Sequence, residues 1–220
     1  MYKNLNKIGL KGWIDVACGG ASIEDKWLRG LDTYLSKLSS INITVLKSKF
    51  SKKLTHLQKN DLLHELEVAC AFHPQSKFLK ENETHPDLFD TTTNTYIEVK
   101  SLNEGLDEQT RHLQNSYISI DAVLSEKIKN KLKNETLSII NKKALFHSDK
   151  ASEQLTNKGI IYLVWDYNKL IDGYPGIIST IDVSHLFKNF VTVFSKDHFK
   201  IKIIPIYFAE LRNHVARSSS

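Results

Sequence analysis

Three side chains that can bind a divalent cation and act on water occur close together in the middle of the chain. They are Asp87, Glu98 and Lys100, the last two separated by a single valine. Carboxylate oxygens are the ligands that hard cations such as Mg²⁺ prefer. A lysine beside such an ion can act on the water that the ion makes reactive. These residue types therefore suit metal-assisted hydrolysis, provided that the chain brings them together.

The sequence over residues 85–102 predicts a β-hairpin. A short strand is expected after Pro86, followed by a turn in the threonine- and asparagine-rich residues 91–95. The chain then returns through a run rich in β-branched and aromatic residues, which is typical of a strand.

Alternation along the second strand of this hairpin would gather the three side chains. Side chains of a strand point to opposite faces in turn, so Ile97 and Val99 are expected to enter a core. Glu98 and Lys100 would then share the other face. Asp87, on the partner strand, could come alongside them.

A helix is expected over residues 54–72, directly before the hairpin. Its apolar stripe consists of Leu62, Leu66 and Ala69. Glu65 falls at the edge of this face, where a carboxylate needs a partner to offset the cost of its burial. A metal ion or Lys100 would supply that partner. Glu67 falls on the opposite flank and is expected to face solvent, and it remains the alternative choice for the helix carboxylate.

At these residues the chain resembles the PD-(D/E)xK nuclease superfamily. Pro86-Asp87 matches the first half of the motif and Glu98-Val99-Lys100 the second half, with a hairpin-sized gap between them. The motif requires a hairpin whose apolar residues alternate with the ExK residues, and the sequence predicts one. The segment Glu65-x-x-Val68-Ala69 is similar to the carboxylate and small apolar residues of the first core helix in this family.

The resemblance implies a metal site and a catalytic lysine. Asp87 and Glu98 would bind Mg²⁺, for which Mn²⁺ could substitute, and the Val99 carbonyl could supply another oxygen. Glu65 would bind the ion directly or through water. Lys100 would orient or help to deprotonate the attacking water and stabilise the transition state.

Residues 150–155 extend the resemblance. Their sequence, Lys-Ala-Ser-Glu-Gln-Leu, is similar to the Lys-Ala-x-x-Gln-Leu element that many members of the family carry on the helix after the ExK strand. The likeness implies that Gln154 and Lys150 position the scissile strand of the substrate.

The elements expected after the hairpin complete an α/β pattern. They are helices over residues 118–132 and 137–157, a nearly continuous apolar strand over 160–165, and a last strand over 199–208. The continuous apolar run is typical of a central strand covered on both faces. Pro205 favours an edge strand or a bulge for the last one.

The order of these elements resembles a restriction-endonuclease-like core, which implies a central mixed β-sheet flanked by helices. The resemblance covers residues 54–208, so we expect a nuclease-like domain over 54–220. Residues 1–53 would form a mainly helical N-terminal extension, with a helix over 23–38 and a short strand over 41–46.

Composition limits the classes to which the chain can belong. Of 220 residues, 41% are hydrophobic, which suffices for a real core, and the net charge of +5 suits a polyanionic partner without requiring one. The basic run over residues 47–53 is expected to be a solvated loop, although it could touch a phosphate backbone. Cys18 and Cys70 stand in no CxxC or Cys/His cluster, which argues against a zinc site or a disulfide framework. No apolar run suggests a signal peptide or a membrane span, so we expect a soluble, cytoplasmic protein.

Together these patterns favour a divalent-metal-dependent nuclease that hydrolyses DNA phosphodiester bonds. An endonuclease of restriction, defence or repair type, acting as a homodimer, is the first expectation. The alternative is a non-catalytic DNA-binding or assembly module that keeps the nuclease fold. A third possibility is an unrelated α/β protein with a chance motif, in which Asp87 and Glu98 would lie too far apart to share an ion.

Overall fold

The computed structural model of the protein describes residues 2–17, 25–51, 54–80, 86–103, 155, 159–166 and 201–218. Within these residues no helix combines the length and the apolar character that crossing a membrane requires. The expected helices over residues 118–132 and 137–157 lie outside the described residues, apart from Leu155, which is buried.

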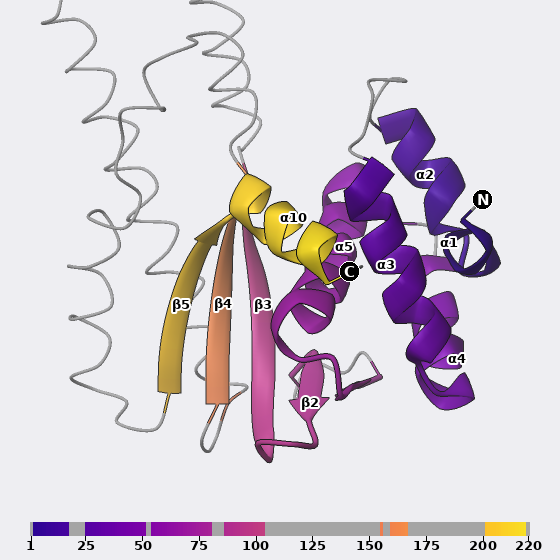
Figure 1. Ribbon diagram of the computed structural model, residues 1–220. Coiled ribbons are helices and arrows are strands. Elements are labelled where there is room, and N and C mark those ends of the chain that lie inside the picture. The colour runs from indigo at the N-terminus through magenta and orange to yellow at the C-terminus, as the bar shows by residue number, and fades with distance from the viewer. Residues whose placement is uncertain are drawn as a thin grey trace, which may run out of the picture.

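The described residues form an α/β fold with a mixed five-stranded sheet in the order β1-β2-β3-β4-β5. The strands are β1 (Ser76–Phe78), β2 (Leu88–Asp90), β3 (Thr95–Asn103), β4 (Gly159–Asp166) and β5 (Ile201–Tyr207). The pairs β1/β2 and β2/β3 are antiparallel, whereas β3/β4 and β4/β5 are parallel. Figure 1 shows β2 to β5 side by side, with the described helices beside them.

The predicted hairpin is confirmed as β2 and β3. Its turn begins where Asp90 pairs with Thr95, and Asn94 adopts φ 51°, the left-handed region that asparagine tolerates. The Asp90 carboxylate accepts a hydrogen bond of 2.8 Å from the Thr92 amide, as is usual for an aspartate that opens a turn.

The two later strands are also confirmed. Ile161 and Leu163 are buried on one face of β4, and Tyr162 and Val164 on the other, as predicted for a central strand. Pro205 lies in β5, the edge strand of the sheet, where a missing backbone N–H is tolerated.

The described helices are α1 (Lys3–Lys7), α2 (Leu10–Ala17), α3 (Asp25–Lys37), α4 (Ser40–Ser51), α5 (His56–Phe72) and α10 (Phe208–Arg217). The helices expected over residues 23–38 and 54–72 are confirmed as α3 and α5. Helix α5 begins in a capping box, in which the Thr55 side chain accepts from the Gln58 amide and the Gln58 side chain accepts from the Thr55 amide.

The strand expected over residues 41–46 is wrong, because this segment belongs to helix α4. Its buried residues are Asn42, Val45, Leu46 and Lys49, which have the i, i+3, i+4, i+7 spacing of one helix face. Two of the four are polar, so the apolar pattern alone did not reveal a helical period. Asn42 is satisfied by strand β1, since it donates to the Ser76 carbonyl and accepts from the Phe78 amide, both at 3.1 Å.

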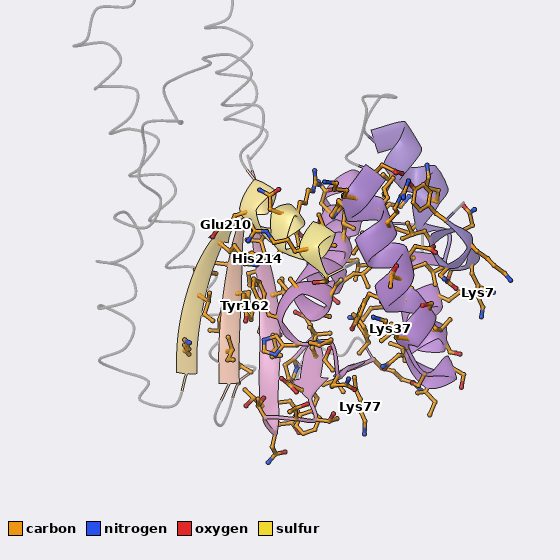
Figure 2. All side chains as sticks on the ribbon, in the orientation of Figure 1. Lys7, Lys37, Lys77, Tyr162, Glu210 and His214 are labelled. Carbon is orange, nitrogen blue, oxygen red and sulfur yellow. The ribbon has the colours of Figure 1, made fainter. Side chains whose placement is uncertain are left out.

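The C-terminal end of α5 is fixed to the sheet by buried polar and aromatic contacts. His73 Nδ1 lies 2.8 Å from Asp90 Oδ2, and His73 Nε2 lies 2.9 Å from the Tyr162 hydroxyl. The ring of Phe72 stacks on the ring of Tyr162, with 5.6 Å between the ring centres. The same ring contacts His214 of α10, with 5.0 Å between the ring centres. Figure 2 shows Tyr162 on β4 and His214 on α10. These contacts hold α5 against the face of the sheet that carries Tyr162.

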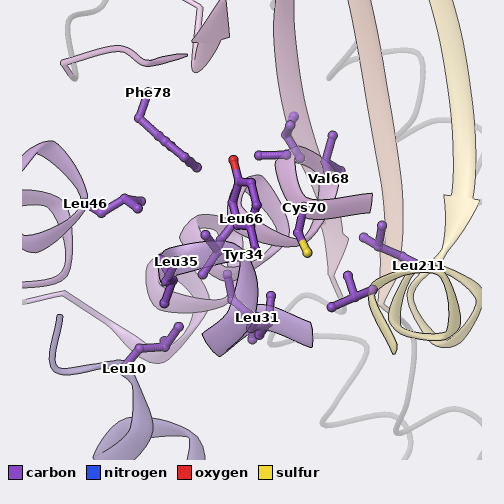
Figure 3. Packing of buried hydrophobic residues seen from close by; sticks show 14 of the residues in the cluster. Leu10, Leu31, Tyr34, Leu35, Leu46, Leu66, Val68, Cys70, Phe78 and Leu211 are labelled. Carbon is purple, nitrogen blue, oxygen red and sulfur yellow. The ribbon is translucent and has the colours of Figure 1, made fainter. Parts of the chain in front are cut away.

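One hydrophobic cluster joins the N-terminal helices, α5, the sheet and α10. Figure 3 labels ten of its members: Leu10, Leu31, Tyr34, Leu35, Leu46, Leu66, Val68, Cys70, Phe78 and Leu211. Helices α1 to α4 therefore share their core with the sheet and with α10.

Candidate active site

The pairing of β2 with β3 brings Asp87 opposite Glu98. Leu88 pairs with Ile97, so one step outward along both strands sets Asp87 beside Glu98. The Asp87 amide donates to Glu98 Oε2 at 3.2 Å, and the Val99 amide donates to Asp87 Oδ2 at 2.8 Å. Strand β2 begins only at Leu88, so the Asp87 carboxylate satisfies a backbone N–H of β3 where strand pairing has ended.

Glu98 and Lys100 lie on the same face of β3, as the alternation predicted. The Lys100 ammonium forms an ion pair with Glu98 Oε1. Only 1% of Glu98 is exposed, whereas 26% of the Lys100 side chain is exposed and Asp87 is half-buried. Solvent, or a ligand, can therefore reach the group through Asp87 and Lys100.

The electrostatics of this group oppose the ionisation of Glu98. Burial, followed by repulsion from the Asp87 carboxylate, raises the pKa of Glu98 to about 7 despite the ion pair with Lys100. Burial alone would lower the pKa of Lys100, but the Glu98, Asp87 and Glu65 carboxylates hold it above its usual value. The site carries negative charge that its lysine does not fully compensate.

Glu65 approaches the same group from helix α5. It is 7% exposed, and its pKa is raised well above the usual value by burial and by Asp87, with Glu98 adding a smaller repulsion. The counter-ion of Glu65 is Lys49 of α4, whose Nζ lies 2.6 Å from Glu65 Oε2. The desolvated carboxylate thus has a partner of the kind that its position requires, and in the described residues this partner is Lys49 rather than Lys100.

Lys49 is a site residue that sequence reasoning missed. It stands in the basic run that was expected to be a solvated loop, yet it is 4% exposed in the structure. The available signal was its spacing of seven residues from Asn42 with Val45 and Leu46 between them, which is one helix face.

The expectation that Glu67 faces solvent is wrong. Glu67 is fully buried, and its Oε1 lies 3.3 Å from Nε of Arg212, a residue of α10. Helix α10 covers this flank of α5, and the sequence patterns predict no helix after the last strand. Glu67 therefore lies with Arg212 and His64, whose Nε2 is 3.9 Å from Glu67 Oε2, away from the hairpin carboxylates.

No family model, curated protein or solved structure matches the chain. The geometry of the residues therefore has to support any functional assignment.

The remaining predicted site residues differ in what the structure shows of them. Gln154 and Lys150 lie outside the described residues. The Val99 N–H points toward Asp87, on the side of β3 where β2 has not yet begun. In an extended strand the N–H and the C=O of one residue point to the same side. That carbonyl therefore lies on the side of Asp87.

The chemistry of the donor set fits a divalent cation, although the described part of the chain contains no cluster of three or more His, Cys, Asp or Glu side chains arranged to hold one. Asp87 Oδ1 accepts no hydrogen bond from a described residue, and it belongs to the same half-buried edge as Glu98. Both ligands are hard oxygens, and a cation between them would relieve the repulsion that raises the pKa of Glu98. Two carboxylates, a carbonyl and water could complete such a coordination shell.

Proposed function

We propose that the protein is a divalent-metal-dependent nuclease of the PD-(D/E)xK type, with a restriction-endonuclease-like core, that hydrolyses DNA phosphodiester bonds. The observation that carries the proposal is the convergence of Asp87, Glu98 and Lys100 at one open edge of β3. A chance motif would not require the carboxylate before β2 to meet the ExK strand in this way. The order of α5, the hairpin, β4 and β5 supports the same assignment.

The residues of this edge would divide the chemistry among them. Asp87 and Glu98 would hold Mg²⁺ or Mn²⁺, with the Val99 carbonyl as a further oxygen ligand. When bound, the ion would lower the pKa of a water molecule and offset charge on the phosphate. Lys100, partly exposed and ion-paired with Glu98, would orient that water and donate to a phosphoryl oxygen as negative charge develops.

The basic character of the protein supports a nucleic-acid substrate. A net charge of +5 favours approach to a phosphate backbone. We propose an endonuclease of restriction, defence or repair type that acts as a homodimer, since a pair of such sites is needed to cut both strands of a duplex in one encounter.

The experiment is plasmid cleavage by the purified protein in Mg²⁺ or Mn²⁺, with and without chelator. We expect chelator to stop cleavage. Asp87→Asn or Lys100→Ala should each reduce the cleavage rate at least about a hundredfold, which is the lower end of what a positioned proton-transfer group contributes. Glu210→Gln and Lys77→Ala, which change exposed charges elsewhere on the surface (Figure 2), serve as matched controls and should cut at the wild-type rate.

Two outcomes would count against the nuclease assignment. Cleavage by Asp87→Asn at the wild-type rate would remove these residues from the reaction. Tight DNA binding without cleavage in either metal would favour the alternative, a binding or assembly module that retains the fold.

A further inference from the structure

The buried ion pair between Lys49 and Glu65 is absent from the catalytic set that the motif predicted. Lys49 comes from α4 and Glu65 from α5, and their charged atoms lie 2.6 Å apart. Only 4% of the Lys49 side chain and 9% of the Glu65 side chain are exposed. A buried lysine at this distance, in a charge-assisted hydrogen bond, neutralises the carboxylate without any metal ion.

The position of this pair gives it a role at the proposed metal site. Glu65 is close enough to Asp87 and Glu98 for their charges to repel it. Without Lys49, the buried negative charge of Glu65 would add to the charges of Asp87 and Glu98, and the attraction of a cation to this region would increase. With Lys49 in place, the negative charge of Glu65 is already compensated.

We propose that Lys49 acts as an internal counter-ion that keeps Glu65 out of the metal coordination shell, so that the edge holds one divalent cation between Asp87 and Glu98. This inference rests on the proposed function, because it presupposes that Asp87 and Glu98 bind the ion. Lys49 is then a positioning residue, which acts on the reaction only through Glu65.

The packing around the pair supports a fixed arrangement. Asn42 lies seven residues before Lys49 on the same face of α4, and hydrogen bonds of 3.1 Å join it to Ser76 and Phe78 of β1. Helix α4 is thereby anchored to the same sheet that carries Asp87 and Glu98. The helix that carries Lys49 is therefore held in place independently of the ion pair. This fixes the position of Lys49 beside Glu65 more strictly than a flexible lysine on the surface would be fixed.

The test is a titration of the 220-residue protein with Mn²⁺. Binding is measured by calorimetry and by the electron paramagnetic resonance signal of the free ion. Lys49→Met removes the charge but keeps a straight side chain of similar size. The double variant Lys49→Met/Glu65→Gln removes both charges and leaves the net charge of the site unchanged. Lys49→Arg preserves the cation.

The inference predicts a specific pattern. The wild type, Lys49→Arg and the double variant should each bind one Mn²⁺ with affinities within about tenfold of one another. Lys49→Met should bind Mn²⁺ more tightly by about tenfold or more, or take up a second ion, because Glu65 is released to act as a ligand. A purely structural ion pair would alter the melting temperature in these variants without altering the metal stoichiometry.

Two results would overturn the inference. One is loss of affinity by more than about tenfold in the double variant, which would make Glu65 a ligand of the wild-type site. The other is unchanged Mn²⁺ binding in folded Lys49→Met. If Lys49→Met fails to fold, the double variant, which buries no uncompensated charge, still tests whether Glu65 is a ligand of the wild-type site, and a loss of affinity there overturns the inference.

Asp87→Asn separates this inference from the proposed function. If the wild type binds Mn²⁺ and Asp87→Asn does not, the proposed site stands and the Lys49 variants test the inference alone. If Asp87→Asn binds like the wild type, or if the wild type binds no Mn²⁺, the proposed site and the inference are both overturned.

Discussion

Glu98 lies in surroundings that oppose its ionisation, although the proposed chemistry needs its carboxylate. Burial and the neighbouring Asp87 raise the pKa of Glu98 from 4.5 to about 7 in the folded protein. Between these two pH values the folded protein keeps a proton that the unfolded chain has released. The contribution of Glu98 to stability is therefore fully present below about pH 4.5 and is lost as the pH rises to about 7.

Comparison of the metal-free wild type with Glu98→Gln tests this pH dependence. Relative to the variant, the wild type should lose on the order of 3 kcal/mol of unfolding free energy as the pH rises from 4.5 to above 7. The measurement is urea denaturation in chelator at several pH values.

The comparison with a variant is needed because His64 acts with the opposite sign. Burial, followed by Arg212, lowers the pKa of His64 to about 3, so His64 costs stability as the pH falls below 6.5. This contribution is present in both proteins and cancels in the difference between them. Parallel stability curves for the two proteins would show that the ionisation of Glu98 is not perturbed by its surroundings.

At the scale of elements, local chemistry made the hairpin and the two later strands predictable. Alternation of Ile97 and Val99 with Glu98 and Lys100 defines one strand by itself, and the run at β4 is apolar on both faces. Each of these signals is contained in fewer than about ten residues, the usual length of a strand.

The elements that the sequence reading missed depend on partners distant in the chain. Helix α4 buries Asn42 and Lys49 only because Ser76, Phe78 and Glu65 lie opposite them. No apolar period marks such a face. Because their burial depends on polar partners distant in the chain, neither helix α4 nor the role of Lys49 could be predicted from the sequence pattern.

Glu67 shows the same limitation on the other flank of α5. Its burial depends on α10, whose Arg212 lies 3.3 Å from the Glu67 carboxylate and 4.6 Å from the centre of the Trp27 ring. A helical wheel of α5 alone cannot show that this flank is covered. Arg212 thus joins α10 to α5 and α3 at once.

We predict that Arg212→Met destabilises the protein by about 3 kcal/mol, because it removes a cation from beside a buried carboxylate. The double variant Arg212→Met/Glu67→Gln should recover part of this loss, since no buried charge then lacks its partner. Urea denaturation of both variants measures the difference. Equal stability of the two variants would mean that the Glu67 carboxylate costs no stability once Arg212 is removed, contrary to the prediction.

At the scale of the whole molecule, the last described helix packs against a helix from the N-terminal part of the chain. Helix α10 follows β5 and crosses back to lie against α3, so that the two ends of the chain stabilise one body (Figure 1). Asp32 of α3 also accepts hydrogen bonds from the amides of Asn4 and Leu5, at 2.8 and 2.9 Å, which fixes α1 to the same helix. The sequence predicted a helical extension over residues 1–53 but gave no sign of what it would contact.

Helices α3 and α10 approach each other closely at Gly30. A Cβ added there would lie 2.3 Å from the Val215 carbonyl oxygen, a distance that backbone atoms can relieve only by moving the helices apart. Gly30 is therefore needed for the packing of α10 on α3. Helix α10 also places Leu211 in the shared core and Arg212 beside Glu67 of α5. A shift of α10 would therefore disturb α5, which presents Glu65 to the candidate site.

The matched pair Gly30→Ala and Gly12→Ala tests this closure. Both glycines lie in helices, where alanine alone should stabilise by up to about 1 kcal/mol. Nothing lies within 4 Å of a Cβ at Gly12, so that variant should show the gain, whereas Gly30→Ala should lose about 1–3 kcal/mol through overpacking. Urea denaturation gives both values, and amide hydrogen exchange should locate the loss in α3 and α10. If both variants are stabilised alike, the two helices do not pack at this distance in solution, and the burial of Glu67 beneath Arg212 would lose its structural basis.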